Sequence, residues 1–208
     1  GQPHRVACIA GTDRGTVPEL LNRFLTVYGS PQFFRVPSIQ DTYELALYLM
    51  QGVRASAGFD FENADYVLSF GSGLLDGWGT PVNIFQAHSR WCERSGKLVQ
   101  IEPRQSRTAA KADSWIPINP GTEGVLALSL AGVIVKESLY NADFVNAQSS
   151  GFDSWQQVLL ENYDTESAAK ITGVDPSTIA KLARDFAGAR KPLAVCGRGK
   201  GQSPGSLK

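Results

Sequence analysis

The chain has 208 residues, of which 42% are hydrophobic and 19% are charged, the composition of an ordinary globular protein. It carries 20 basic and 20 acidic residues, so its formal net charge is zero. There is no basic field or basic tail that would bind nucleic acid or a membrane surface. The longest apolar run, residues 125–135, contains Ser129 and Gly132 and is too short to span a bilayer, so it predicts a core helix.

The first half of the chain alternates between strand and helix patterns. "RVACIAG" predicts a buried strand near residues 6–10, and "TVPELLNRFLTVYGS" has the apolar spacing of a helix. Asp41 and Glu44 form a capping-box pair, which predicts a helix with Asp41 as its N-cap that runs to about Gly52. "ADYVLSFGSG" predicts a strand near residues 66–70, and "PVNIFQAHSRWCERSG" predicts the helix that follows it.

The second half continues this alternation. "KLVQIEPR" predicts a strand near residues 98–102, "DSWIPINPGTEG" predicts a short strand and a turn, and "GVLALSLAGVIVKE" predicts a helix opened by Glu123. Two or three helices are expected over residues 140–173. "VDPSTIAKLARDFAGA" predicts a helix capped by Asp175, and "KPLAVCGRGKG" predicts a last strand near residues 192–196.

Strands that alternate with helices predict an α/β fold in three layers, with a doubly wound, mainly parallel, Rossmann-like sheet between the helices. The sequence starts with Gly1 instead of Met and ends in the glycine-rich stretch "GRGKGQSPGSLK" directly after a strand pattern. We therefore expect a fragment of a larger multidomain chain, from which any localisation signal has been lost.

The cysteines and histidines show no metal-binding spacing. Cys8, Cys92 and Cys196 are widely separated, no CxxC occurs, and neither His4 nor His88 has a partner at ligand spacing. This pattern argues against a zinc or iron–sulfur site built from this chain alone. Cys8 and Cys196 lie in apolar runs and are predicted to be small core residues of strands.

The first candidate site follows the strand near residues 66–70, because ligands of parallel α/β sheets bind at the carboxyl ends of strands. In "SFGSGLLDGWGTP", Gly71 and Gly73 would let the backbone approach a phosphate closely, and the N–H groups of the turn would cradle it. The alternative for the later part, from Asp76 to Gly79, is a simple turn.

The second candidate site follows the strand near residues 98–102. Glu102 stands just past this strand, where a carboxylate accepts hydrogen bonds from the ribose or base of a nucleotide. Arg104 and Arg107 would serve a phosphate or an internal salt bridge. The alternative for Glu102 is a pair with Arg104 or with another neighbour.

Two further strand ends carry polar or glycine-rich residues. Thr122 and Glu123 stand at a helix start, where capping is a sufficient explanation for Thr122. Glu123 would bind the edge of a guanine or favour the helix dipole. "CGRGKG" is a glycine turn after the last strand, and it does not match the Walker A motif.

Together these segments resemble the molybdopterin oxidoreductase family, which includes dimethyl sulfoxide and arsenate reductases and formate dehydrogenases. "NADYVLSFGSG" resembles the family's strand and turn "ADxxxxxGxNP". "LVQIEPRQSRTAAKADSWIPINPGTEGVLALSLAGVIV" resembles its longer signature "hDPRxTxTAxxADxxxxxxPGTDxALxxAhxxxh". "TGVDPSTIAKLARDFAGARKPLAVCGRG" resembles the stretch that leads into the family's next domain, so that the similarity covers most of residues 5–199.

Members of this family bind two pterin-guanine dinucleotides around a molybdenum or tungsten atom. The resemblance implies that Gly71, Ser72 and Gly73 would meet the phosphates of one molybdopterin guanine dinucleotide. Gly197 and Gly199 would begin the region that holds the second dinucleotide. The isolated fragment is expected to lack bound dinucleotide and to show no turnover, because the rest of the cradle and any iron–sulfur relay lie outside it.

The resemblance also places residues of the longer signature at the dinucleotide. Glu102, Thr122 and Glu123 would meet its guanine and ribose. The other signature residues carried over as cofactor-binding are Pro103, Arg104, Thr108 and Gly121. Residues 1–190 would form the central dinucleotide-binding domain, and residues 191–208 would begin the following domain or supply a strand that completes the sheet.

Gln40 departs from the family pattern. In "YGSPQFFRVPSIQDTY" it stands where the family places a cysteine, selenocysteine or serine that ligates the metal, and an amide oxygen is a poor neutral donor beside thiolate or alkoxide. Gly73 also stands where asparagine is usual. We therefore expect no metal ligand at Gln40, although an ordinary exposed residue before a helix and a serine ligand at Ser30 or Ser38 stay open as alternatives.

Three interpretations follow. The chain is a fragment of a catalytic molybdopterin oxidoreductase, a fragment of a metal-free molybdopterin-like subunit that organises a quinone-linked complex such as menaquinone reductase or alternative complex III, or an unrelated nucleotide-binding α/β domain. For the first two, the resemblance implies iron–sulfur and membrane quinone-interacting partner subunits in anaerobic respiration. It also implies a periplasmic or membrane-associated location.

Overall fold

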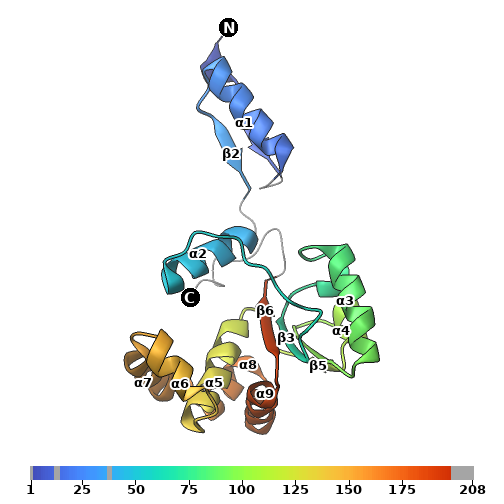
Figure 1. Cartoon of the computed structure of the whole chain (residues 1–208), viewed down its shortest axis with the longest axis vertical. Coiled ribbons are helices and arrows are strands. Elements are labelled where there is room, and N and C mark those ends of the chain that lie inside the picture. Colours follow the sequence, from blue (N-terminus) through green and yellow to red (C-terminus); the bar gives the residue numbers. More distant parts are fainter. Residues whose placement is uncertain (1, 12–14, 37–38, 198–208) are drawn as a thin grey trace. The chain divides into compact units, whose positions relative to one another are not determined.

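The computed structural model describes residues 2–11, 15–36 and 39–197, and of Ile39 and Gln40 it describes the backbone alone. The described residues divide into two compact units, one that ends at Ala57 and one that begins at Gly58 (Figure 1). Each unit has its own parallel sheet.

The first unit contains a two-stranded sheet and two long helices. Its elements are η1 (Pro3–Arg5), β1 (Cys8–Ala10), α1 (Thr16–Tyr28), β2 (Phe33–Arg35) and α2 (Ile39–Gln51). The strand predicted near residues 6–10 is present as β1, but it pairs with β2 and not with the larger sheet. The sequence did not predict β2, since three residues are too few to show a period.

The prediction that Asp41 caps the second helix is wrong. The helix α2 begins at Ile39, so Asp41 lies in its first turn, where a carboxylate still favours the helix dipole. Its Oδ1 atom lies 3.0 Å from the guanidinium of Arg35. The helix ends at Gln51, one residue before the predicted end.

The second unit carries the larger sheet, whose strand order is β5-β4-β3-β6 with every neighbouring pair parallel. Its strands are β3 (Tyr66–Phe70), β4 (Lys97–Ile101), β5 (Ser114–Ile116) and β6 (Pro192–Cys196). Its helices are η2 (Leu74–Asp76), α3 (Pro81–Glu93), α4 (Arg107–Lys111), α5 (Glu123–Lys136), α6 (Ala142–Gln148), α7 (Phe152–Asn162), α8 (Thr165–Thr172) and α9 (Pro176–Gly188).

The predicted parallel α/β fold is therefore confirmed for this unit, in which helices cover both faces of the sheet (Figure 1). One face packs on α5, α8 and α9. The buried side chains of this apolar face are Tyr66, Leu68 and Phe70 of β3, Val99 and Ile101 of β4, and Leu126, Leu130, Val133, Ala168, Ile179, Leu182 and Ala183 of the helices.

The opposite face lies toward η2, α3 and α4 and also contains polar groups. Successive side chains of a strand point to opposite faces, so Val67, Ser69, Leu98 and Gln100 lie on this second face. All four are buried. Neither η2 nor α4 was predicted, since each is shorter than two helical turns.

The order of the strands reverses at β3. The chain passes from β3 outward to β4 and β5, and it then returns to place β6 on the other side of β3. Ligands of open α/β sheets bind in the crevice at such a reversal, outside the carboxyl ends of the strands. Of the two alternatives for residues 191–208, the position of β6 fits a strand that completes the sheet; the predicted domain boundary stays a prediction.

Candidate functional site

The carboxyl ends of β3 and β6 meet at this reversal, and each continues into a buried glycine with a positive φ angle. Gly71 has φ +68° and Gly197 has φ +100°, a conformation that side chains other than hydrogen disfavour. The Gly71 N–H donates to Ile101 O at 2.8 Å, and the Gly197 N–H donates to Phe70 O at 3.2 Å. Two of the predicted glycines thus open adjacent turns, while Gly199 lies outside the described residues.

The turn after Gly71 leaves two backbone donors free. In the described part of the chain, the N–H groups of Ser72 and Gly73 make no hydrogen bond. The Ser72 carbonyl accepts from the Leu74 N–H at 2.9 Å and from two buried side chains of the sheet, those of Ser69 and Gln100. Turns with successive free N–H groups bind anions in many proteins, so the phosphate contact expected from the glycines stays a prediction for this turn.

Gly73 has a packing role next to Asp76. A Cβ atom at Gly73 would lie 3.2 Å from the Cβ atom of Asp76, so Asp76 would have to shift by a few tenths of an ångström. Glycine at this position, where the family usually has asparagine, therefore accompanies the close approach of Asp76. This contact gives a structural reason for the departure that does not involve a metal.

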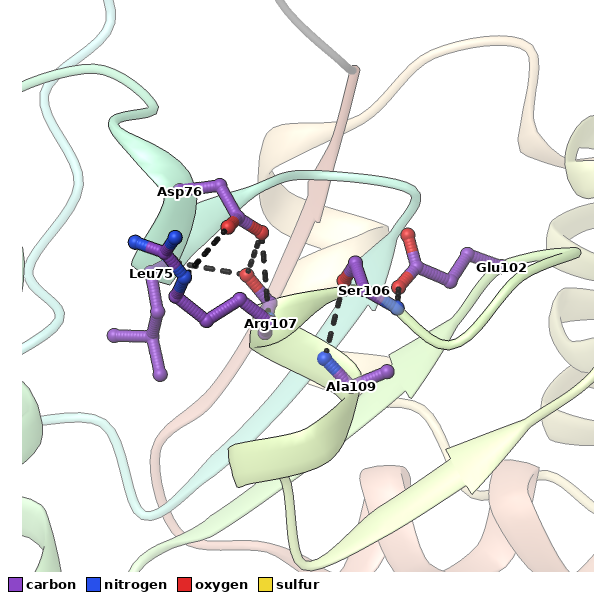
Figure 2. Close-up of polar contacts among 7 residues, drawn as sticks. Leu75, Asp76, Glu102, Ser106, Arg107 and Ala109 are labelled. Carbon is purple, nitrogen blue, oxygen red and sulfur yellow. Dashed lines mark hydrogen bonds and ion pairs between the residues drawn. The ribbon is translucent and has the colours of Figure 1, made fainter.

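Asp76 joins the loop after β3 to the loop after β4 (Figure 2). Its Oδ2 atom accepts from the Thr108 hydroxyl at 3.0 Å and from the Thr108 N–H at 3.3 Å, while its Oδ1 atom lies 3.7 Å from Nε of Arg107. The Thr108 hydroxyl in turn accepts from the Leu75 N–H at 3.0 Å. We call Asp76, Thr108 and Leu75 the loop clamp.

The loop clamp changes the interpretation of Thr108 and Asp76. Thr108 was predicted as a cofactor-binding residue, but it is fully buried and its hydroxyl both donates and accepts within the protein. We therefore assign Thr108 to holding the two loops together. The alternative of a simple turn from Asp76 to Gly79 agrees with the left-handed Gly77, whereas no local pattern indicates the partner of Asp76.

Glu102 is 4% exposed and uses one of its carboxylate oxygens to order the loop after β4. Its Oε1 atom accepts from the Ser106 N–H at 3.1 Å, and the Ser106 hydroxyl accepts from the Ala109 N–H at 3.2 Å as the N-cap of α4 (Figure 2). Among the described residues Glu102 makes no ion pair, and Oε2 makes no hydrogen bond. Of the predicted alternative, a pair of Glu102 with Arg104 or with another neighbour, the pair with Arg104 is absent from the described residues, and the hydrogen bond from Ser106 is a contact with a neighbour.

Arg104 is exposed and follows Pro103 in the same loop, without an ion pair in the described part of the chain. Arg107 forms an ion pair with Asp76. This is the internal salt bridge that was one of the two roles predicted for the arginines of this segment. The loop after β4 consequently presents one open carboxylate oxygen and one open guanidinium at the edge of the sheet.

The third predicted strand end leads into α5. Gly121 has φ +79°, and Thr122 occupies the N-cap position, as predicted. The hydroxyl of Thr122 does not cap the helix, however, because it donates to Asn119 O at 2.7 Å. Glu123 is half-buried in the first turn of α5, which lies at the carboxyl edge because α5 follows β5.

The residues considered as metal ligands belong to the first unit. Gln40 lies in the first turn of α2, and its side chain and the whole of Ser38 are outside the described residues, so their roles stay predictions. Ser30 is buried, and its hydroxyl donates to the carbonyl of Val6. No three His, Cys, Asp or Glu side chains in the described part of the chain are grouped so that they could hold a metal ion.

Three polar side chains at this edge were missed by the sequence interpretation, namely Ser69, Gln100 and Asp76. The available signal was a polar residue within an otherwise apolar strand of a parallel sheet, since such strands are buried on both faces. Ser69 in "YVLSF" and Gln100 in "KLVQI" are such residues, and in the structure they are direct neighbours across β3 and β4.

A parallel α/β unit with glycine turns at its strand reversal has the architecture of the doubly wound folds, many of which bind nucleotides. Comparison with known proteins then identifies the family: the sequence model described as molybdopterin oxidoreductase matches residues 20–203, and the chain belongs to this family.

Similarity to individual proteins supports this family membership. The chain is 34% identical to the menaquinone reductase molybdopterin-binding-like subunit of Nitratidesulfovibrio vulgaris over 97% of its own length and 28% of that protein. It is 28% identical to the arsenate respiratory reductase molybdopterin-containing subunit ArrA of Shewanella sp. over 93% of its length and 25% of that protein.

A solved structure shares the fold. Acetylene hydratase from Pelobacter acetylenicus superposes with a TM-score of 0.74 at 26% identity, over 93% of this chain and 26% of that one. The chain thus spans about a quarter of the length of the curated relatives it matches. In the helices of the described residues there is no stretch long and apolar enough to cross a membrane.

Proposed function

We propose that this chain supplies the dinucleotide-binding edge of a molybdopterin-family subunit that works in respiratory electron transfer. The observation that carries the proposal is the turn Gly71–Ser72–Gly73, where the partly exposed Gly73 has a free N–H group, at the strand reversal that also carries Glu102, whose Oε2 atom makes no hydrogen bond among the described residues. A pyrophosphate group accepts hydrogen bonds from such a turn, and a carboxylate beside it accepts from ribose or from a guanine edge.

The donor set fits a pterin-guanine dinucleotide. The N–H group of Gly73 would hold its phosphates, with the exposed guanidinium of Arg104 as the counter-charge. Glu102 and Glu123 would accept hydrogen bonds from its guanine and ribose. When bound, the pterin would carry the redox-active metal, and the residues described here would hold and orient the nucleotide end.

A metal-free scaffold is the second candidate function. It is supported by Gln40 at the expected position of the metal ligand and by similarity to a relative that is itself described as molybdopterin-binding-like. In this alternative the dinucleotide-binding scaffold organises a quinone-linked complex without metal chemistry. For either candidate we propose iron–sulfur and quinone-interacting partner subunits at the periplasmic or membrane-associated face of a respiratory complex.

Metal and pterin analysis of the full-length protein tests both candidates. About one molybdenum or tungsten per chain together with pterin would support the catalytic function and refute the scaffold. Pterin without metal, or neither of them in an intact complex that still transfers electrons to quinone, would support the scaffold. The isolated 208-residue chain is expected to show no oxidoreductase turnover in either case, and measurable turnover would refute that expectation.

A further inference from the structure

Three buried polar side chains form a cluster at the turn Gly71–Ser72–Gly73, one from the turn itself and two from the strands that contact it. Ser69, Ser72 and Gln100 are each 0% exposed, and Ser69 and Gln100 are register partners on β3 and β4. Two atoms of the cluster, the Oγ atom of Ser72 and the Oε1 atom of Gln100, have no hydrogen-bond partner in the described part of the chain. Burying an acceptor without a hydrogen-bond partner costs free energy. An apolar residue at position 100 would therefore favour folding more than Gln100 does.

The cluster holds one carbonyl group in a fixed direction. The Ser72 carbonyl accepts from the Gln100 Nε2 atom at 3.1 Å, from the Ser69 hydroxyl at 3.2 Å and from the Leu74 N–H at 2.9 Å. Two of these donors belong to the interior of the sheet, so the carbonyl points inward.

The direction of this carbonyl sets the direction of an N–H group. The peptide bond between Ser72 and Gly73 is planar and trans, so the Gly73 N–H points away from the Ser72 carbonyl. With the carbonyl held inward, the Gly73 N–H is turned outward, and it makes no hydrogen bond in the described residues. The buried side chains therefore determine where the free donor points.

We propose that Gln100 and Ser69 are positioning residues that orient the Ser72–Gly73 peptide toward a phosphate or pyrophosphate group of the ligand. The inference rests on the proposed dinucleotide-binding function and assigns to it two residues that do not touch the ligand. Preorganised donors bind an anion more tightly than donors that must first turn, and this gain offsets the cost of burying Gln100.

The test is the binding of GDP and of inorganic pyrophosphate to the cofactor-free full-length protein, measured by titration calorimetry. The variants are Gln100→Met, which keeps the length of the side chain but removes its donor, and Ser69→Ala. Ser129→Ala is the matched control, because Ser129 is another fully buried serine with an unpartnered hydroxyl but lies in α5. Hydrogen exchange of the peptide that contains Gly73 gives a second readout, independent of affinity.

We expect Gln100→Met to weaken binding of both probes by about tenfold, the size of one hydrogen bond to a charged group. Ser69→Ala should weaken it less, and Ser129→Ala should not change it. In the first two variants the ligand should also protect the Gly73 amide less from exchange. Unchanged affinity in Gln100→Met, or loss of GDP binding with pyrophosphate binding retained, would overturn the inference and leave the proposed function standing.

A wild-type protein that binds neither probe would overturn the inference together with the proposed dinucleotide site. If Gln100→Met does not fold, Ser69→Ala decides: weaker binding of both probes with less protection of the Gly73 amide supports the inference, and wild-type behaviour in both measurements overturns it.

Discussion

The two faces of the larger sheet are both buried, but one is apolar and the other also contains polar side chains. The face that packs on α5, α8 and α9 is apolar along β3 and β4, from Tyr66 to Ile101. The face toward η2, α3 and α4 contains Ser69 and Gln100, which are also fully buried. An apolar interior suffices for folding, so the polar face identifies where the protein retains groups for another purpose.

The polar face also lies beneath the loops that carry the candidate site. Ser69 and Gln100 are the last side chains of their strands on this face, two residues before Gly71 and Glu102. The loop clamp then ties the same two turns to each other. We expect the apolar face to contribute mainly to stability and the polar face mainly to ligand binding.

The largest effect on stability is expected at Leu126, which is fully buried in the apolar face. Leu126→Ala should lower the free energy of unfolding by about 3 kcal/mol, because it removes packed atoms and leaves a cavity. Urea unfolding monitored by circular dichroism measures it, with Leu126→Met as the control that keeps the volume. A loss below about 1 kcal/mol would show that the apolar face collapses around the missing side chain.

An intermediate effect is expected at the loop clamp. Thr108→Val keeps the shape of the side chain but leaves the Leu75 N–H without its acceptor and removes the hydroxyl donor to Asp76, and should cost about 1–3 kcal/mol. Thr108→Ser, which keeps the hydroxyl, is the control. A double-mutant cycle with Asp76→Ala measures the coupling, and strictly additive losses would mean that the two residues do not act as a clamp.

A still smaller effect on stability is expected at Gln100. Gln100→Met should change the free energy of unfolding by less than about 1 kcal/mol, because it removes an unpartnered acceptor together with one of three donors to the Ser72 carbonyl. The same urea titration measures it. A loss above about 2 kcal/mol would make Gln100 a residue that the fold requires, and the contrast between the faces would then fail.

Much of the fold could be predicted from sequence because its signals are local. The apolar runs of β3, β4 and β6 and the capped helix α9 repeat over enough residues to show their period. The pairing of β1 could not be predicted, since strand partners are chosen by contacts between distant residues and β2 has only three residues.

The candidate site shows the same limit. The glycines at positions 71 and 73 and the carboxylate of Glu102 were visible, because turn residues and charges at strand ends are local features. The partners of Asp76 and Gln100 lie 32 and 28 residues away in the sequence. The type of a single residue does not indicate such distant partners, and the same holds for Thr108, whose partners Leu75 and Asp76 are also distant in the sequence.

The smallest effect is expected at the surface of the apolar side, where Asp175 caps α9. Its carboxylate accepts from the Ser177 hydroxyl at 2.6 Å, from the Thr178 hydroxyl and from the Thr178 N–H at 2.9 Å, and these hydrogen bonds lower the pKa of Asp175 from 3.8 to about 2. A carboxyl whose pKa is lower in the folded state stabilises the fold fully above its unfolded pKa. That contribution is lost as the pH falls through the folded pKa.

The midpoint of thermal unfolding should therefore fall more steeply between pH 4 and pH 2 in the wild-type protein than in Asp175→Asn, since this window follows from the two pKa values of Asp175. Asparagine is also a good N-cap, so it keeps the helix start but has no proton to gain. Equal slopes in the two proteins would mean that the cap does not contribute to acid sensitivity. Because Ile179 and Leu182 of α9 belong to the apolar face, a steeper wild-type slope would show that a surface charge stabilises that face through its helix.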